Sequence, residues 1–297
     1  MNMSGEIAAV LTALCWSGGS LLFTLSSWRI GSATVNHARL WLGLFLLMGL
    51  HLLVFGKLFP TDAAPERFFW LGISGVVGYV AGDGMLFESF VIIGPRLAML
   101  LMTLVPIFST ILAWIFLHEY LAIPEIAAVA VTLAGIAFVV SEKKNRENAG
   151  AKHFIRGAIL GVGGALGQAV GLLFAKKGLV NDFSALSGNL IRVAAAFLCL
   201  ALSAVLRGKV TGHLQKLRDK RAFAYVFLAA VFALVLGVGL SLYSIARTEI
   251  GIASTLMSLS PLFLIPLSHI FLKERITLRA IIGTVIAFVG STLLFFI

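Results

Sequence analysis

Apolar residues run through this chain in long stretches, which short polar breaks or breaks with glycine and proline separate. A helix needs about 20 consecutive apolar residues to cross a bilayer. The pattern therefore predicts an all-α integral membrane protein. Its ten expected transmembrane helices are 5–26, 34–56, 67–90, 95–117, 123–141, 155–175, 183–206, 222–246, 251–272 and 277–296.

The second half of the sequence repeats the first. Gly82–Val139 aligns without a gap to Gly237–Leu294, 155 positions later. Each repeat holds five predicted helices, and because five is odd the second repeat enters the membrane from the opposite side. Two inverted repeats around a central cavity are thus expected, an arrangement typical of transporters. The expected domains are 1–141 (first repeat), 142–154 (basic linker loop) and 155–297 (second repeat).

Composition agrees with a membrane protein. Only 12% of the residues are charged, about half the usual share of a soluble domain, and the mean hydropathy is +1.02. The net charge of +10 could suggest nucleic acid, but the charges sit in short loops, so no nucleic-acid partner is expected. About sixteen Lys and Arg residues lie in loops on one side, including 142–156 and 207–221, against five on the other. The positive-inside rule places that side in the cytoplasm. The chain is thus expected to be a multi-pass protein of the cell (inner) membrane.

Carboxylates inside a predicted span are the first candidates for function. A charged side chain at the bilayer centre costs roughly 2.5–3.5 kcal/mol on insertion scales, so it normally faces a cavity or a partner. Asp83 lies well inside the third helix, and Glu88 lies further along it. Either could pair with Arg39 at the start of the second helix. For Asp83 we weigh contact with a substrate amine or transport of a proton against a structural ion pair; Glu88 could simply reach the interface.

Polar residues that occur in both repeats suit a scaffold, because a substrate is rarely symmetric. Asn36 and Arg39 recur as Asn189 and Arg192, and we expect them to bond neighbouring helices. Glu119 recurs as Glu274 at helix ends, where capping or a loop cation accounts for both. Pro106 recurs as Pro261, and each is expected to kink a helix interior.

Polar residues that the repeats do not share are better candidates for substrate contact, since recognition needs asymmetry. Trp and Tyr side chains offer an apolar face and one donor, which suits an amphipathic ligand, although both also anchor at interfaces. A structural hydrogen bond is the favoured role for the histidine of this set. The predicted cavity residues are Trp16, Gln168, Tyr79, Tyr243 and His269, besides Asp83 and Glu88.

The motif Trp16-Ser-Gly occurs in the first half, and three others occur once in each half. These are the Arg39 and Arg192 pair, Leu104-Val-Pro106-Ile-Phe108 with Leu259-Ser-Pro261-Leu-Phe263, and Leu117-His-Glu119-Tyr-Leu121 with Leu272-Lys-Glu274-Arg-Ile276. On these motifs the chain resembles the EamA family of the drug/metabolite transporter superfamily over nearly its whole length. The resemblance implies export or exchange of small metabolites, such as amino acids, by ten helices around a central cavity.

The function expected is a secondary transporter, acting as an exporter of amino acids or related amphipathic compounds by alternating access. The chain has no Walker sequence, so a gradient or exchange must drive it, and a proton is a candidate coupling ion. The alternative is a membrane-embedded enzyme acting on lipid or isoprenoid substrates, which would need clustered metal ligands or a nucleophile with its base. The sequence holds only scattered candidates, so no catalytic residue, metal or cofactor is expected. The expected partners are a small-molecule substrate and the lipid bilayer, and a monomer suffices for an inverted repeat in one chain.

Overall fold

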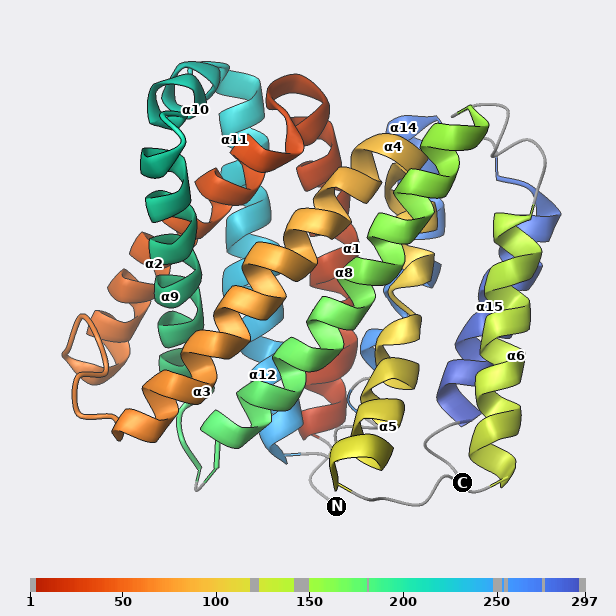
Figure 1. The fold of residues 1–297 in the computed structure, drawn as a ribbon, viewed down its shortest axis with the longest axis horizontal. Helices are drawn as coiled ribbons and strands as arrows, with labels where there is room; N and C mark the ends of the chain where they lie inside the picture. The colour runs from red at the N-terminus through yellow and green to blue at the C-terminus, as the bar shows by residue number, and fades with distance from the viewer. Residues whose placement is uncertain are drawn as a thin grey trace.

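The structure, a computed structural model, describes residues 4–117, 123–141, 150–180, 182–247, 253, 256–273 and 276–293. Every regular element in these ranges is a helix (Figure 1). The first half of the chain forms α1 (Ser4–Ile30), α2 (Ser32–Phe55), α3 (Pro65–Gly75), the π-helix η1 (Val76–Gly82), α4 (Asp83–Leu101), α5 (Leu104–Leu117) and α6 (Ile123–Val140). The second half forms α8 (Ala151–Gly178), α9 (Ala185–Leu206), α10 (Val210–Lys216), α11 (Lys220–Ala229), the π-helix η2 (Ala230–Gly237), α12 (Val238–Arg247), α14 (Ser260–Leu272) and α15 (Leu278–Leu293).

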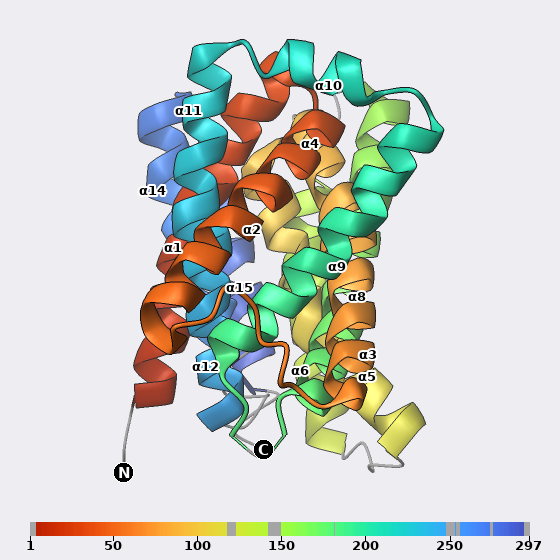
Figure 2. The same ribbon diagram turned by 90° about the vertical axis from the view of Figure 1, so that its left-hand side faces the viewer.

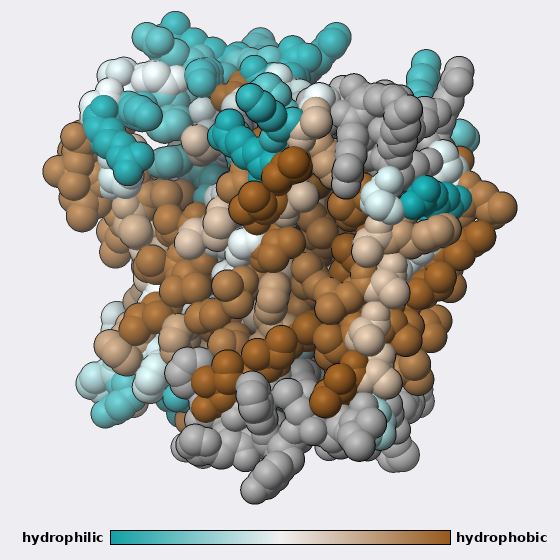
Figure 3. Space-filling view, turned by 45° about the vertical axis from the view of Figure 1, so that its right-hand side comes forward, coloured by the Kyte–Doolittle hydropathy of each residue, from teal (hydrophilic) through white to brown (hydrophobic). Residues whose placement is uncertain are grey.

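The outer surface is apolar where a bilayer would surround it. Six helical stretches of the described chain are long and apolar enough to cross a membrane, and three shorter apolar helices accompany them. Large apolar side chains point outward along these helices; Leu53 is 85% exposed and Leu206 76%. In Figure 3 apolar residues cover the middle of the visible face, and hydrophilic residues gather toward its upper edge. The prediction of an all-helical, multi-pass membrane protein is confirmed.

The boundary predicted between the spans 67–90 and 95–117 is a kink in the structure. The helical run from Pro65 to Leu101 is interrupted at Gly94, where φ is 81° and ψ 158°. This left-handed conformation suits glycine, and the following Pro95 cannot donate the backbone hydrogen bond that would continue the helix. The segment 207–221, predicted as a loop, contains α10, which lies at the same edge as the ends of α9 and α11 (Figure 2).

Each half packs its third span on the first helix of the other half. The continuous α3–η1–α4 segment lies against α8, and α11–η2–α12 lies against α1. Small residues permit the close approach: a Cβ on Gly167 would come within 2.7 Å of the Gly82 Cα atom. The Ser74 hydroxyl donates to the Gly171 carbonyl (2.6 Å), and the Thr12 hydroxyl to the Gly237 carbonyl (3.2 Å). Small residues and hydroxyl bonds of this kind are how helices associate in membranes.

Both π-helices end at glycines that the repeat matches, Gly82 in η1 and Gly237 in η2. A π-helix adds a residue to one turn and is frequent at functional sites. Here η1 packs on α8 and η2 packs on α1, so both lie where the halves meet. The sequence pattern contains no sign of this irregularity.

The two matched prolines begin helices. Pro261 stands in the first turn of α14, and Pro106 is the third residue of α5. The chain turns just before them, at Met102–Thr103 and at Ser258–Leu259. A proline is tolerated in the first turn because its missing N–H would have no partner there. The sequence predicted that each proline would kink a continuous helix. The structure instead has a break before each proline, after which a new helix begins.

An acidic cap ties the two halves together at the edge where α10 lies. The Asp219 carboxylate accepts from the backbone N–H groups of Arg221 and Ala222 at the start of α11 (both 3.1 Å). It also accepts from the Arg29 side chain at the end of α1 (2.8 Å). The Ala222 N–H first, and then the Arg29 guanidinium, hold the pKa of Asp219 below its ordinary value. The cap thus stays ionised at neutral pH.

Candidate functional site

A cavity of about 120 Å³ lies between the two halves. It is of the same order as the apolar cavity of about 150 Å³ that binds benzene in another protein. Both halves line it: α1, α2, η1, α4 and the start of α5 from the first, and α8, η2, α12 and the start of α14 from the second. The residues that line the cavity are mostly apolar, and the charged ones among them are Arg39 and Asp83.

The Arg39 and Asp83 side chains form a buried ion pair at the wall of the cavity. Arg39 Nη2 lies 2.6 Å from Asp83 Oδ2, and the two side chains are 4% and 11% exposed. Arg39 Nε donates to Asn36 Oδ1 (2.8 Å), and the Phe87 ring lies beneath the guanidinium group at 4.8 Å. Each charge thus has a partner, which a buried ion pair requires.

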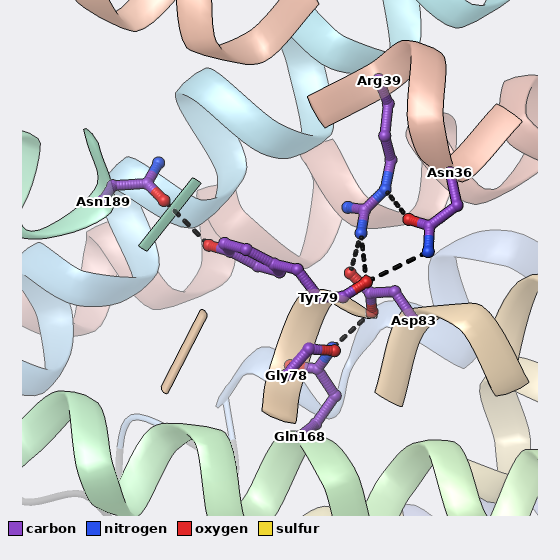
Figure 4. Close-up of polar contacts among 7 residues, drawn as sticks. All are labelled: Asn36, Arg39, Gly78, Tyr79, Asp83, Gln168 and Asn189. Atoms are coloured by element: carbon purple, nitrogen blue, oxygen red, sulfur yellow. Dashed lines mark hydrogen bonds and ion pairs between the residues drawn. The ribbon is translucent and has the colours of Figure 1, made fainter. Parts of the chain in front are cut away.

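Two polar side chains extend the network from this pair (Figure 4). Gln168 of α8 donates its amide to the second oxygen of Asp83 and to the Gly78 carbonyl (3.3 Å). The backbone carbonyl of Tyr79 accepts from Asn36 and from Arg39, both at 3.2 Å. The network joins α2, η1, α4 and α8, so it spans the contact between the two halves.

Tyr79 carries the network on to the second half. Its hydroxyl donates to Asn189 Oδ1 of α9 at 2.8 Å, and Asn189 donates its amide to the Leu234 carbonyl at 3.0 Å. The Tyr79 ring contacts two guanidinium groups, Arg39 at 5.4 Å and Arg192 at 4.6 Å. The aromatic face favours both cations.

The structure brings four of the predicted cavity residues to this cavity: Trp16, Tyr79, Asp83 and Gln168 line it. The carboxylate of Glu88 instead accepts from the Ser32 hydroxyl (2.5 Å) and pairs with Arg156 (3.3 Å), closer to the edge where α10 lies. The predicted pairing of Arg39 with a carboxylate therefore falls to Asp83.

Two other predicted cavity residues lie elsewhere. The Tyr243 ring contacts the guanidinium group of Arg247 on its own helix (4.4 Å), and His269 is exposed on α14. Neither is among the described residues that line the cavity. Repeat asymmetry at a position does not fix which way its side chain points, which explains the difference. Glu119 and Glu274 lie outside the described residues.

Sequence reasoning missed much of the lining. Phe23, Phe87, Phe90, Met99 and Met102 supply apolar walls, and Thr103, Ser258 and Ser260 supply hydroxyl groups near the two helix breaks. Apolar residues in an apolar helix carry no distinguishing pattern. The hydroxyl residues stand just before Pro106 or Pro261, and that position was the available signal. Among the described residues no group of three His, Cys, Asp or Glu side chains could hold a metal ion.

Parts of this chain are similar to known archaeal proteins, one of which is named as a transporter. An uncharacterized transporter of Archaeoglobus fulgidus is 52% identical over 40 residues, 14% of each chain. The chain thus matches only a small part of the length of that relative. The uncharacterized protein MJ1333.1 of Methanocaldococcus jannaschii is 29% identical over 137 residues, which are 46% of this chain and 93% of that protein. A match of that extent is about one repeat long.

The fold is also known from experiment. A solved crystal structure covers 100% of this chain and 98% of its own with a TM-score of 0.67, at 12% identity. At that identity the likeness concerns the fold alone. The sequence matches the EamA-like transporter family twice, over residues 3–141 and 155–296. Because the two matches cover nearly the whole chain, this multi-pass membrane protein belongs to the EamA-like transporter family.

Proposed function

We propose that this protein is a secondary transporter that exports small amphipathic metabolites, amino acids or related compounds, by alternating access through the cavity between its halves. The cavity offers a largely apolar wall with a few polar groups at one side, which suits a molecule with an apolar body and a polar end. Its size limits the cargo to a small metabolite.

The observation that carries this proposal is the pair of helix breaks at Met102–Thr103 and Ser258–Leu259. The repeat relates them to within one residue, since Thr103 corresponds to Ser258, and Met102, Thr103 and Ser258 line the cavity. Irregular backbone inside a bilayer is tolerated where it is buried or lines a cavity, and broken helices in corresponding positions of two repeats are a common feature of transporter substrate sites. Two equivalent breaks on either side of one cavity favour a site about which the halves move.

The topology that we propose has ten spans in two inverted five-helix repeats, 1–141 and 155–297. The helical segments before and after each break together count as one span. The loops 142–156 and 207–221 then face the cytoplasm of the cell (inner) membrane, since they concentrate Lys and Arg. One chain contains both repeats, so a monomer would be the working unit.

Asp83 is the residue through which we propose coupling to a proton. Its carboxylate already accepts from Arg39 and Gln168, which belong to opposite halves. A proton or a substrate amine on Asp83 would compete with both partners for its oxygens, and the hydrogen bond from Gln168 is the one that joins the halves. Binding would thereby favour a change in how the halves pack.

Export by living cells tests the proposal. Wild type, Asp83→Asn and Asp62→Asn would be expressed in a bacterium depleted of exporters, and a panel of amino acids and related metabolites measured inside and outside over time. We expect one compound to accumulate outside with wild type and with Asp62→Asn, whose parent aspartate pairs with Lys57 at the surface. We expect roughly tenfold or larger loss with Asp83→Asn, since the site loses a charge-assisted hydrogen bond.

Protein in the membrane must be equal in all three strains for the comparison to hold. No export of any compound by wild type at high expression contradicts the transport proposal. Equal export by Asp83→Asn, with unchanged pH dependence, contradicts only proton coupling through Asp83.

A further inference from the structure

The two repeats build the same polar unit twice, and the second copy is incomplete. In the first half Asn36 Nδ2 donates to the carbonyl of Tyr79. In the second half Asn189 Nδ2 donates to the carbonyl of Leu234, the residue 155 positions after Tyr79. The two asparagines thus bond equivalent carbonyls. Arg192 follows Asn189 by three residues, as Arg39 follows Asn36, and is therefore the counterpart of Arg39 in the second unit.

The carboxylate of the first unit has no counterpart in the second. Asp83 pairs with Arg39, but the residue 155 positions after Asp83 is Val238. The glycines on both sides are retained, since Gly82 and Gly84 recur as Gly237 and Gly239. The change thus removes one negative charge from a backbone setting that is otherwise kept.

Arg192 also lacks the side-chain acceptor that Arg39 has in the first unit. Asn36 Oδ1 accepts from Arg39 Nε, whereas Asn189 Oδ1 accepts from the Tyr79 hydroxyl. Arg192 is 1% exposed, and its Nε has no hydrogen-bond partner among the described residues. Within the part of the chain that the structure describes, its guanidinium group contacts the Tyr79 ring and forms no ion pair. A buried cation in this condition is expensive, so an unfilled donor here points to a ligand.

Arg192 lies next to the cavity. A Cβ on Gly78 would come within 3.5 Å of Arg192 Nη2 and 3.9 Å of Gln168 Oε1, so the guanidinium group and a lining residue flank the same glycine. Leu234 and Val238, the counterparts of Tyr79 and Asp83, are lining residues too. Among the described residues, the polar wall thus has the Arg39 guanidinium group and the Asp83 carboxylate in its lining, and the Arg192 guanidinium group packs behind it on the Tyr79 ring, so one of the two positive charges has no carboxylate partner there.

From these observations we infer that Arg192 is an anion-recognition residue, and that a carboxylate group of the cargo takes the place over Val238 that Asp83 fills in the first half. The apolar body of such a ligand would lie against Trp16, Phe87 and Met102. That the ligand is the cargo rests on the proposed transport function. It replaces the purely structural role that the repeat symmetry of Arg192 suggested.

Binding by the purified protein tests the inference without any transport. The probe is phenylacetate, with phenylacetamide as its uncharged counterpart and sodium chloride at equal ionic strength as the inorganic anion. Thermal unfolding in detergent is followed over a concentration series, because a ligand that binds the folded state raises the melting temperature. We expect phenylacetate to stabilise wild type at about tenfold or more lower concentration than phenylacetamide, as loss of a charge-assisted bond implies.

Variants at Val238 separate charge from shape. Val238→Asp supplies the missing carboxylate, so it should melt at a higher temperature without ligand and lose its response to phenylacetate. Val238→Asn has the same size without the charge and should keep the response. Arg192→Gln should lose it, which covers the case in which Val238→Asp does not fold.

Equal responses to phenylacetate and phenylacetamide, or a Val238→Asp protein that responds as wild type does, would overturn the inference. So would a response to chloride that equals the response to phenylacetate, because the ligand would then be an inorganic ion. Absence of export with this binding intact would refute the transport proposal and leave the anion site standing.

Discussion

Replacing Asp83 by alanine is expected to lower the free energy of unfolding by about 3–5 kcal/mol, the usual cost of removing one partner of a buried ion pair. The reason is the charge that remains. Arg39 is buried, with a side chain 4% exposed, and its other bonds go to uncharged acceptors. Arg192 already contributes a second buried cation beside the same Tyr79 ring. The measurement is unfolding of the purified protein in detergent.

The double variant Arg39→Met/Asp83→Leu distinguishes a charge effect from a loss of packing. Replacing a buried pair by apolar residues of similar volume is often neutral or stabilising, so the double variant should recover most of the loss. A double variant as unstable as the sum of its single variants would show that packing accounts for the effect. An unchanged melting temperature for Asp83→Ala would contradict the buried pair itself.

Gly75→Ala is expected to lower the free energy of unfolding by about 1–3 kcal/mol, the typical cost of overpacking. A Cβ on Gly75 would overlap the backbone of Arg192, 2.7 Å from its carbonyl carbon and 2.8 Å from its Cα atom. Backbone cannot rotate away as a side chain can, so α3 and α9 would have to separate. The shift would also displace Arg192 from the Tyr79 ring. Thermal unfolding in detergent measures the loss.

The matched control is Gly72→Ala, one turn earlier on the same helix. A Cβ there would meet the Ala195 Cβ at 3.8 Å, which is ordinary contact. Alanine is also the better helix former by about 0.5–1 kcal/mol, so this variant should match wild type or exceed it. If both variants lost the same stability, helix propensity or insertion would explain the result, and close packing at Gly75 would not.

Much of the fold could be predicted from the sequence because a bilayer requires long apolar helices, and because identical residues such as Gly82 and Gly237 reveal the repeat. The irregularities could not. The π-helices lie where the third spans meet the opposite half, and the breaks before Pro106 and Pro261 lie beside the cavity, and neither setting can be seen in the sequence. A single proline in an apolar run is compatible with a kink, a break or a helix start.

The candidate site was predictable in part, for the same physical reason. Asp83 is costly in a membrane, so its position alone marks it, and its nearness to Arg39 follows from where the helices begin. Glu88, Tyr243 and His269 were chosen because the repeats differ there, which says nothing of direction along a helix face. The aromatic and methionine walls of the cavity carry no sequence mark, since apolar residues face lipid and cavity alike.

In the mechanism that we propose, the cavity between the halves opens to each side of the membrane in turn. Thr103 lines it beside the first helix break and is 1% exposed. A Thr103→Cys protein without its native cysteines, Cys15→Ser and Cys199→Ser, would be reconstituted in oriented vesicles and treated with a membrane-impermeant maleimide from one side or the other. We expect the maleimide to label the new cysteine from both sides, and we expect cargo to slow the labelling from each side. Labelling from one side alone, whatever the conditions, would contradict it.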